Sequence, residues 1–189
     1  MPHLNIWEIR RLMMSRLTDS KLRSDRFRCG LYGVLPARER RRRGLSRFEG
    51  YFKFGFVRNP WDRVVSLYLR REGDQVHRSK SFEEFVKTIR YSSATCLHPS
   101  PHVNQLDWLV DPSGRVVVDY IGRFETLQQD WNNICATLGI ASRDLPVKKQ
   151  NHVARDHYSK FYTRETADLI ADRFRADIDF FGYEFEWVE

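Results

Sequence analysis

The sequence predicts an α/β fold in which a short parallel sheet is flanked by helices. Two segments rich in aromatic and β-branched residues, 51–57 and 116–121, have the composition of buried strands. Each is followed by a segment whose apolar residues recur at helical spacing. Strands that alternate with helices in this way are typical of parallel sheets.

Composition limits the classes of protein to which the chain can belong. Its 189 residues suffice for one domain with a hydrophobic core, and a hydrophobic content of 41% excludes a disordered composition. We therefore expect residues 1–189 to form a single domain. The three cysteines, Cys29, Cys96 and Cys135, are too scattered for a disulfide framework or a metal site, so no metal is expected.

Charge and hydropathy bear on partners and location. The net charge of +7 predicts attraction to polyanions such as phosphorylated cofactors or acidic glycans. The aromatic residues near the basic segment form no nucleic-acid-binding signature, so we expect no nucleic acid. No apolar run approaches the ~20 residues of a membrane helix, and no signal peptide is visible. A cytoplasmic location is the simplest expectation, and a luminal fragment of a membrane-anchored enzyme is the alternative.

The first fifty residues hold one predicted helix and one basic segment. Residues 3–17 place apolar side chains at helical spacing after a capping box at Asn5 and Glu8. Residues 18–50 include the run Arg40–Arg43, where like charges repel one another and favour a solvated loop. We interpret this segment as a basic, loop-rich insertion. The alternative is an electrostatic funnel for an anionic substrate.

The segment 51–71 organises the rest of the chain. After the strand at 51–57, Asn59 has the side chain of a helix N-cap, and Pro60 suits the first helical position. From Trp61 onward the apolar residues fall at helical spacing. The sequence therefore predicts a strand, a tight turn and a helix.

This unit has the groups that bind an anion. A helix that begins just beyond a strand end offers open amides and the positive end of its dipole. Arg58 adds a fork of donors and Ser66 a hydroxyl. Together they suit a dianionic phosphate.

Local signals predict the remaining elements. They are a helix from about Phe82 after a capping box at Ser81 and Glu84, a turn at 111–114, a helix at 126–138 ended by Gly139, a basic loop at 145–158, and a helix from about 164 to Phe174 capped by Thr163.

The residues around Arg58 resemble a known motif. The pattern Arg58-Asn59-Pro60-x-Asp62-x-x-Val65-Ser66-x-Tyr68 is similar to the 3′-phosphate motif of sulfotransferases that use 3′-phosphoadenosine 5′-phosphosulfate (PAPS). The flanking Phe-x-Phe-Val-Arg-Asn-Pro-Trp-Asp-Arg resembles their carbohydrate branch, including its bacterial members. This resemblance implies a P-loop nucleotide-kinase-like fold in which Arg58 and Ser66 hold the 3′-phosphate and the start of the helix at Asn59 contributes amides.

Other positions take expected roles from the same resemblance. His3, just before the first helix, resembles the family's general base, and its ordinary pKa suits proton transfer at neutral pH. His102 and Gln105 resemble a segment close to the acceptor. A late loop closes over the nucleotide in PAPS enzymes. Its candidates here are Lys148, Lys149, Asn151 and Arg155.

One part of the family pattern is not found. The family's strand and loop for the 5′-phosphosulfate precede its first helix, and nothing before His3 can supply them. The first strand of the sheet is then missing too. We expect either a fragment or mis-started reading frame of an active enzyme, or a short relative without efficient catalysis, and favour the first.

The resemblance implies transfer of a sulfuryl group from PAPS to a hydroxyl, with a carbohydrate as the expected acceptor. The product would be adenosine 3′,5′-bisphosphate, and no metal would be needed. The alternative is a non-catalytic nucleotide- or polyanion-binding relative that uses the run Arg40–Arg43.

Overall fold

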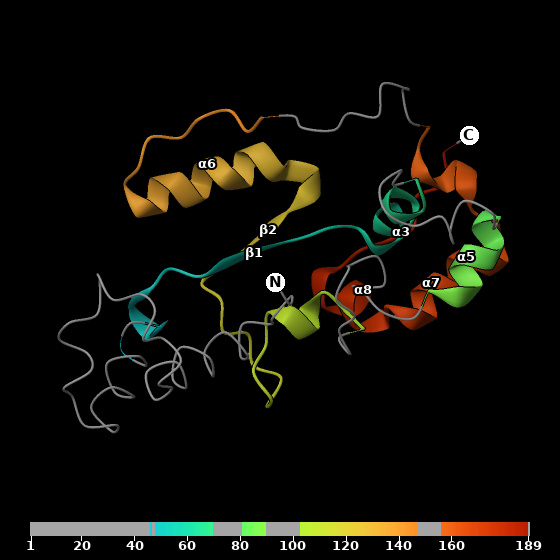
Figure 1. Cartoon of the computed structure of the whole chain (residues 1–189), viewed down its shortest axis with the longest axis horizontal. Helices are drawn as coiled ribbons and strands as arrows, with labels where there is room; N and C mark the ends of the chain where they lie inside the picture. The colour runs from blue at the N-terminus through green and yellow to red at the C-terminus, as the bar shows by residue number, and fades with distance from the viewer. Residues whose placement is uncertain (1–45, 47, 70–80, 90–102, 147–155, 189) are drawn as a thin grey trace, which may run out of the picture. The chain divides into compact units, whose positions relative to one another are not determined.

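The computed structural model of the chain describes residues 46, 48–69, 81–89, 103–146 and 156–188. Two short strands, β1 and β2, pair in a parallel sheet, and helices make up most of the remaining elements (Figure 1). The predicted α/β class with a short parallel sheet is therefore confirmed. In chain order the elements are β1 (Phe54–Val57), α3 (Pro60–Tyr68), α5 (Phe82–Thr88), η3 (Leu106–Trp108), β2 (Tyr120–Arg123), η4 (Phe124–Thr126), α6 (Leu127–Leu138), η5 (Tyr158–Phe161), α7 (Arg164–Arg173) and α8 (Arg175–Phe181).

The described residues fall into two compact units. The larger one comprises the described parts of 55–107 and 121–189 and contains every α-helix named above. The smaller one comprises the described residues up to Phe54 together with 108–120. The single domain expected for residues 1–189 stays a prediction.

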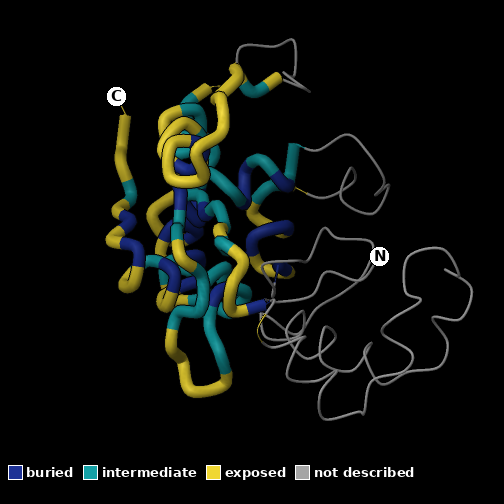
Figure 2. Tube along the Cα trace, turned by 90° about the vertical axis from the view of Figure 1, so that its left-hand side faces the viewer, coloured by how far each residue is buried: buried dark blue, intermediate teal, exposed yellow. Residues whose placement is uncertain are grey.

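The core of the larger unit lies where α3, α5 and α7 pack on one another. Val65, Val86 and Ile170, one from each helix, are fully buried. Figure 2 colours the buried residues of the described chain dark blue. Trp61 ties α3 to α7, because its indole Nε1 donates a hydrogen bond to the carbonyl of Ala167 at 2.9 Å. The apolar face that the sequence predicts for α3 is therefore its packing face.

The predicted helix ends are confirmed. Ser81 and Glu84 form a reciprocal capping box at the start of α5. Thr163 caps α7 in the same way, with Thr166 as its partner. Gly139 ends α6 with a φ of 67°, a left-handed conformation that favours glycine. These signals are local, so they could be recognised without the fold.

The second strand lies later than predicted. The sequence places it at 116–121, but β2 occupies Tyr120–Arg123, and Val116 forms only an isolated antiparallel bridge with Val110. The start of the predicted strand pairs with another segment, because the Val117 N–H donates to the Leu109 carbonyl at 3.0 Å. β2 instead includes Gly122, where a Cβ would stand 2.5 Å from Cε1 of Phe56 on β1. A side chain at residue 122 would therefore force the Phe56 ring to shift, and glycine lets the two strands approach without that shift.

In the smaller unit, two carboxylates order the backbone. The Asp119 carboxylate accepts hydrogen bonds from the Lys53 backbone N–H at 2.7 Å and from its Nζ at 2.9 Å. Oδ1 of Asp111 accepts the backbone N–H groups of Ser113 and Arg115 at 2.9 and 3.2 Å, closing the predicted turn, which contains Gly114 at a φ of 81°.

Candidate functional site

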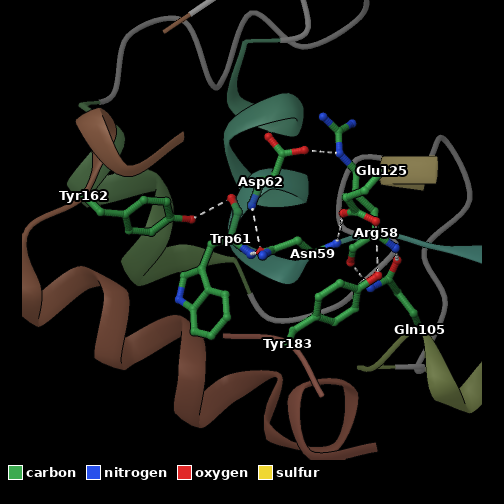
Figure 3. Close-up of polar contacts among 8 residues, drawn as sticks. All are labelled: Arg58, Asn59, Trp61, Asp62, Gln105, Glu125, Tyr162 and Tyr183. Atoms are coloured by element: carbon green, nitrogen blue, oxygen red, sulfur yellow. Dashed lines mark hydrogen bonds and ion pairs between the residues drawn. The ribbon is translucent and has the colours of Figure 1, made fainter. Parts of the chain in front are cut away.

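The turn between β1 and α3 begins as the sequence predicts. Asn59 is the N-cap of α3 and Pro60 its first residue. Oδ1 of Asn59 accepts the backbone N–H of Trp61 at 3.0 Å and that of Asp62 at 3.4 Å (Figure 3). The first amides of the helix are therefore capped by the chain itself, which differs from the expectation that they are open to a ligand. The cofactor-binding role of Asn59 stays a prediction.

The Arg58 guanidinium is held in one orientation by the protein, and within the described chain its two terminal nitrogens remain available to a ligand. Its Nε donates to Oδ2 of Asp62, one turn into α3, at 2.5 Å, and its Cζ lies 4.2 Å from the centroid of the Phe124 ring. Figure 3 shows the hydrogen bond from Nε to Asp62 and none from the two terminal nitrogens among the residues drawn. The Arg58 side chain is 19% exposed. One edge and one face of the group are fixed, and the other edge can bind an anion with two parallel hydrogen bonds.

Gln105 holds the backbone of Arg58. Its Oε1 accepts the Arg58 N–H at 3.0 Å, and its Nε2 donates to the Arg58 carbonyl at 2.8 Å (Figure 3). The side-chain amide of Gln105 thus pairs with this peptide segment as a neighbouring strand would. The predicted contact of Gln105 with the acceptor stays a prediction, and the structure shows its amide bound within the protein.

Asp177 on α8 holds Gln105 in turn. One of its carboxylate oxygens accepts the Gln105 backbone N–H at 2.8 Å and Nε2 at 3.2 Å, and the other accepts the Leu106 N–H at 2.8 Å. Burial raises the pKa of Asp177, and these hydrogen bonds and the charge of Arg63 oppose that rise. A buried carboxylate with this many donors is a structural anchor.

Glu125 on η4 holds the next residue of the turn. Its Oε1 accepts the Asn59 N–H at 2.6 Å, and its Oε2 accepts the Tyr183 hydroxyl at 3.4 Å. Burial and the negative charge of Glu125 raise the pKa of Tyr183, so the phenol keeps its proton and donates. Arg123 lies over the Tyr183 ring at 4.8 Å and donates to the Phe181 carbonyl at 2.5 Å. Glu125 thus braces the turn directly, and Arg123 holds Tyr183, the residue that donates to Glu125.

Ser66 lies on the same face of α3 as Asp62, because the two residues are four positions apart in one helix. Its side chain is half-buried, and within the part of the chain that the structure describes its hydroxyl makes no hydrogen bond. The structure thus leaves this hydroxyl available on the face that carries the Arg58–Asp62 pair. Its phosphate-binding role stays a prediction.

Several of the predicted site residues lie outside the described residues. The same holds for the basic run Arg40–Arg43. The site residues concerned are His3, His102, Lys148, Lys149, Asn151 and Arg155.

Sequence reasoning missed three contributors to the site. Asp177, Tyr183 and Phe124 all contact the turn or the residues that hold it. Asp177 had only a weak signal: it is one of three carboxylates in the stretch 177–185, with Asp179 and Glu184, and any of them that is buried requires partners. Phe124 and Tyr183 carried no such signal.

The described ranges hold neither a metal-binding cluster nor a membrane-spanning helix. Within them, no three His, Cys, Asp or Glu side chains are grouped so that they could hold a metal ion. No helix in these ranges combines the length and apolar character that crossing a membrane requires.

Comparison with known proteins gives one family and one relative. The family model described as "Sulfotransferase family" matches residues 37–184. A protein of Archaeoglobus fulgidus described as "Uncharacterized protein" is 34% identical over 123 residues, which cover 64% of this chain and 93% of that protein. No solved structure gives a significant match.

Proposed function

Because this chain belongs to the sulfotransferase family, we propose that it transfers a sulfuryl group from PAPS to a hydroxyl of a carbohydrate acceptor. Family membership supports sulfuryl transfer in general. The PAPS donor and the carbohydrate acceptor are proposed from the sequence pattern around Arg58.

The observation that carries the proposal is the geometry of Arg58. Its guanidinium is held through Nε by Asp62 and through one face by Phe124, so its terminal nitrogens are fixed in direction before any ligand arrives. A preorganised fork binds a phosphate with little loss of side-chain entropy. We assign it to the 3′-phosphate of the nucleotide, with the Ser66 hydroxyl as a second donor.

PAPS supplies the sulfuryl group, which passes to the acceptor oxygen as the bond between sulfur and the nucleotide phosphate oxygen breaks. Arg58 and Ser66 bind the end of the nucleotide that does not react, and this binding orients the donor for in-line attack. His3 is the proposed base that takes the proton of the acceptor hydroxyl. Lys148, Lys149, Asn151 and Arg155 are proposed to close over the nucleotide, and His102 and Gln105 to lie near the acceptor.

The proposal is tested by calorimetric titration of the full chain with adenosine 3′,5′-bisphosphate and with AMP, which lacks the 3′-phosphate. We expect the bisphosphate to bind more tightly. We expect Arg58→Ala to weaken bisphosphate binding by roughly 10- to 100-fold, because charge-assisted hydrogen bonds are each worth about 1.5–3 kcal/mol. Arg58→Ala should leave AMP binding unchanged.

Arg115→Ala is the matched control. It removes the same charge from a side chain that is 79% exposed and lies in the smaller unit. Equal losses in both variants, abolished by salt, would identify the binding as nonspecific attraction of polyanions and contradict the proposal.

A further inference from the structure

The turn that carries Arg58 has its backbone polar groups bound by side chains distant in sequence. The N–H and carbonyl of Arg58 pair with the amide of Gln105, 47 residues away. The N–H of Asn59 pairs with Glu125, 66 residues away. The turn is thus fixed by tertiary contacts rather than by its own sequence alone.

Asp177 is the most buried of the side chains that hold this turn. It is 1% exposed, and both of its carboxylate oxygens accept hydrogen bonds from residues 105 and 106. The same carboxylate also accepts Nε2 of Gln105, the atom that donates to the Arg58 carbonyl. Asp177 therefore fixes both the backbone and the side-chain amide of Gln105.

We infer that Gln105 and Asp177 are positioning residues for the phosphate site, which set the direction of the Arg58 guanidinium by clamping its peptide. In this assignment Gln105 and Asp177 act through Arg58 and are not themselves ligands of the phosphate. The inference rests on the proposed function, because it assigns these residues to the site at which Arg58 binds the 3′-phosphate.

The clamp matters because the Arg58 side chain is held at only two places within the described chain, by Asp62 at Nε and by Phe124 at one face. Both contacts require that the peptide of Arg58 stays in its position. A shift of the peptide moves the fork relative to the Ser66 hydroxyl on α3, and a small misplacement of a binding group weakens recognition strongly.

A merely structural role predicts a different result from a positioning role. Destabilisation lowers the folded fraction and so lowers the apparent affinity for every ligand by the same factor. Loss of positioning lowers the affinity only for the ligand that carries the 3′-phosphate. The ratio of the affinities for adenosine 3′,5′-bisphosphate and AMP separates the two roles, because the folded fraction cancels in the ratio.

The experiment measures this ratio for the full chain and for Gln105→Ala and Asp177→Asn, with the amide hydrogen exchange of Arg58 as a second readout. Tyr162→Phe is the control. It removes a hydrogen bond of 3.0 Å to the Trp61 carbonyl in α3 and leaves the Arg58 peptide intact. We expect both test variants to lower the ratio roughly tenfold, as for a buried hydrogen bond left unpaired, and to expose the Arg58 amide to exchange. Tyr162→Phe should change neither.

The results separate a failure of this inference from a failure of the proposed function. An unchanged ratio with a protected Arg58 amide in the test variants, or an equal fall in Tyr162→Phe, overturns the inference and leaves the proposed function standing. If the unaltered chain shows no preference for the bisphosphate, or a preference that does not depend on Arg58, both fall. If one test variant does not fold, the other decides.

Discussion

Gly122 on β2 lies directly against the ring of Phe56 on β1. A Cβ at Gly122 would stand 2.5 Å from Cε1 and 2.7 Å from Cδ1 of that ring, and 3.0 Å from Cβ of Asp130. A Cβ at such distances would force the Phe56 ring to shift, so glycine at residue 122 lets the two strands approach without that shift.

We expect Gly122→Ala to lower the free energy of unfolding by about 1–3 kcal/mol, because the added methyl overpacks a buried contact. Chemical denaturation measures the effect. Gly50→Ala is the control, since nothing lies within 4 Å of a Cβ there, and it should not destabilise the chain. Equal stability of Gly122→Ala and the unaltered chain would show that Phe56 can move aside.

Arg58→Lys is expected to weaken adenosine 3′,5′-bisphosphate binding by at least about tenfold, although the charge is kept. Lysine has a single ammonium and cannot pair with Asp62 and present two parallel donors at the same time. Calorimetric titration measures the change. Full affinity in the lysine variant would mean that a single positive charge is enough to bind the bisphosphate.

Ser66→Ala is expected to weaken bisphosphate binding by several-fold, the effect of a hydrogen bond worth about 1 kcal/mol. Its thermal stability should stay the same, since the Ser66 hydroxyl makes no hydrogen bond within the described residues. Titration and thermal unfolding of the same preparation test both parts. A loss of stability without a loss of affinity would assign Ser66 to the fold.

Glu125→Ala is expected to destabilise the chain by about 1 kcal/mol, because Asn59 and Tyr183 both lose their acceptor. Water can replace part of that interaction, since Glu125 is itself exposed. Glu83→Ala is the control. It breaks an exposed ion pair with Lys87 and should have a smaller effect on denaturant unfolding. The reverse order would contradict the bracing role of Glu125.

Asp177 is expected to give stability a pH dependence. Its pKa in the folded chain lies above the ordinary value of 3.8, mainly because of burial. The folded state therefore binds this proton more tightly than the unfolded state. The stabilisation is fully present below the ordinary pKa and is lost as the pH rises through the folded-state value.

Asp177→Asn removes this dependence. The loss of unfolding free energy caused by the substitution should therefore be larger at about pH 4 than at about pH 7. Denaturant unfolding of both chains at each pH measures the difference. A loss that is larger at the higher pH would mean that the hydrogen bonds to the carboxylate outweigh its burial.

The sequence by itself determined the local parts of this protein. The N-cap at Asn59, the capping box at Ser81 and the C-terminal stop at Gly139 each depend on groups within a few residues, so residue type and spacing suffice to predict them. The apolar spacing from Trp61 onward likewise identified the buried face of α3. The Arg58 motif pointed to the same turn that the structure braces.

Only the tertiary structure decided which groups hold that turn and where the second strand lies. Gln105 meets Asp177 across 72 residues of chain, and Asn59 meets Glu125 across 66. Such pairings depend on how whole elements pack, which no local pattern encodes. The same packing brings Gly122 against Phe56 and moves the strand to Tyr120–Arg123. The sequence determines what each segment can form, and long-range packing selects which of its polar groups meet.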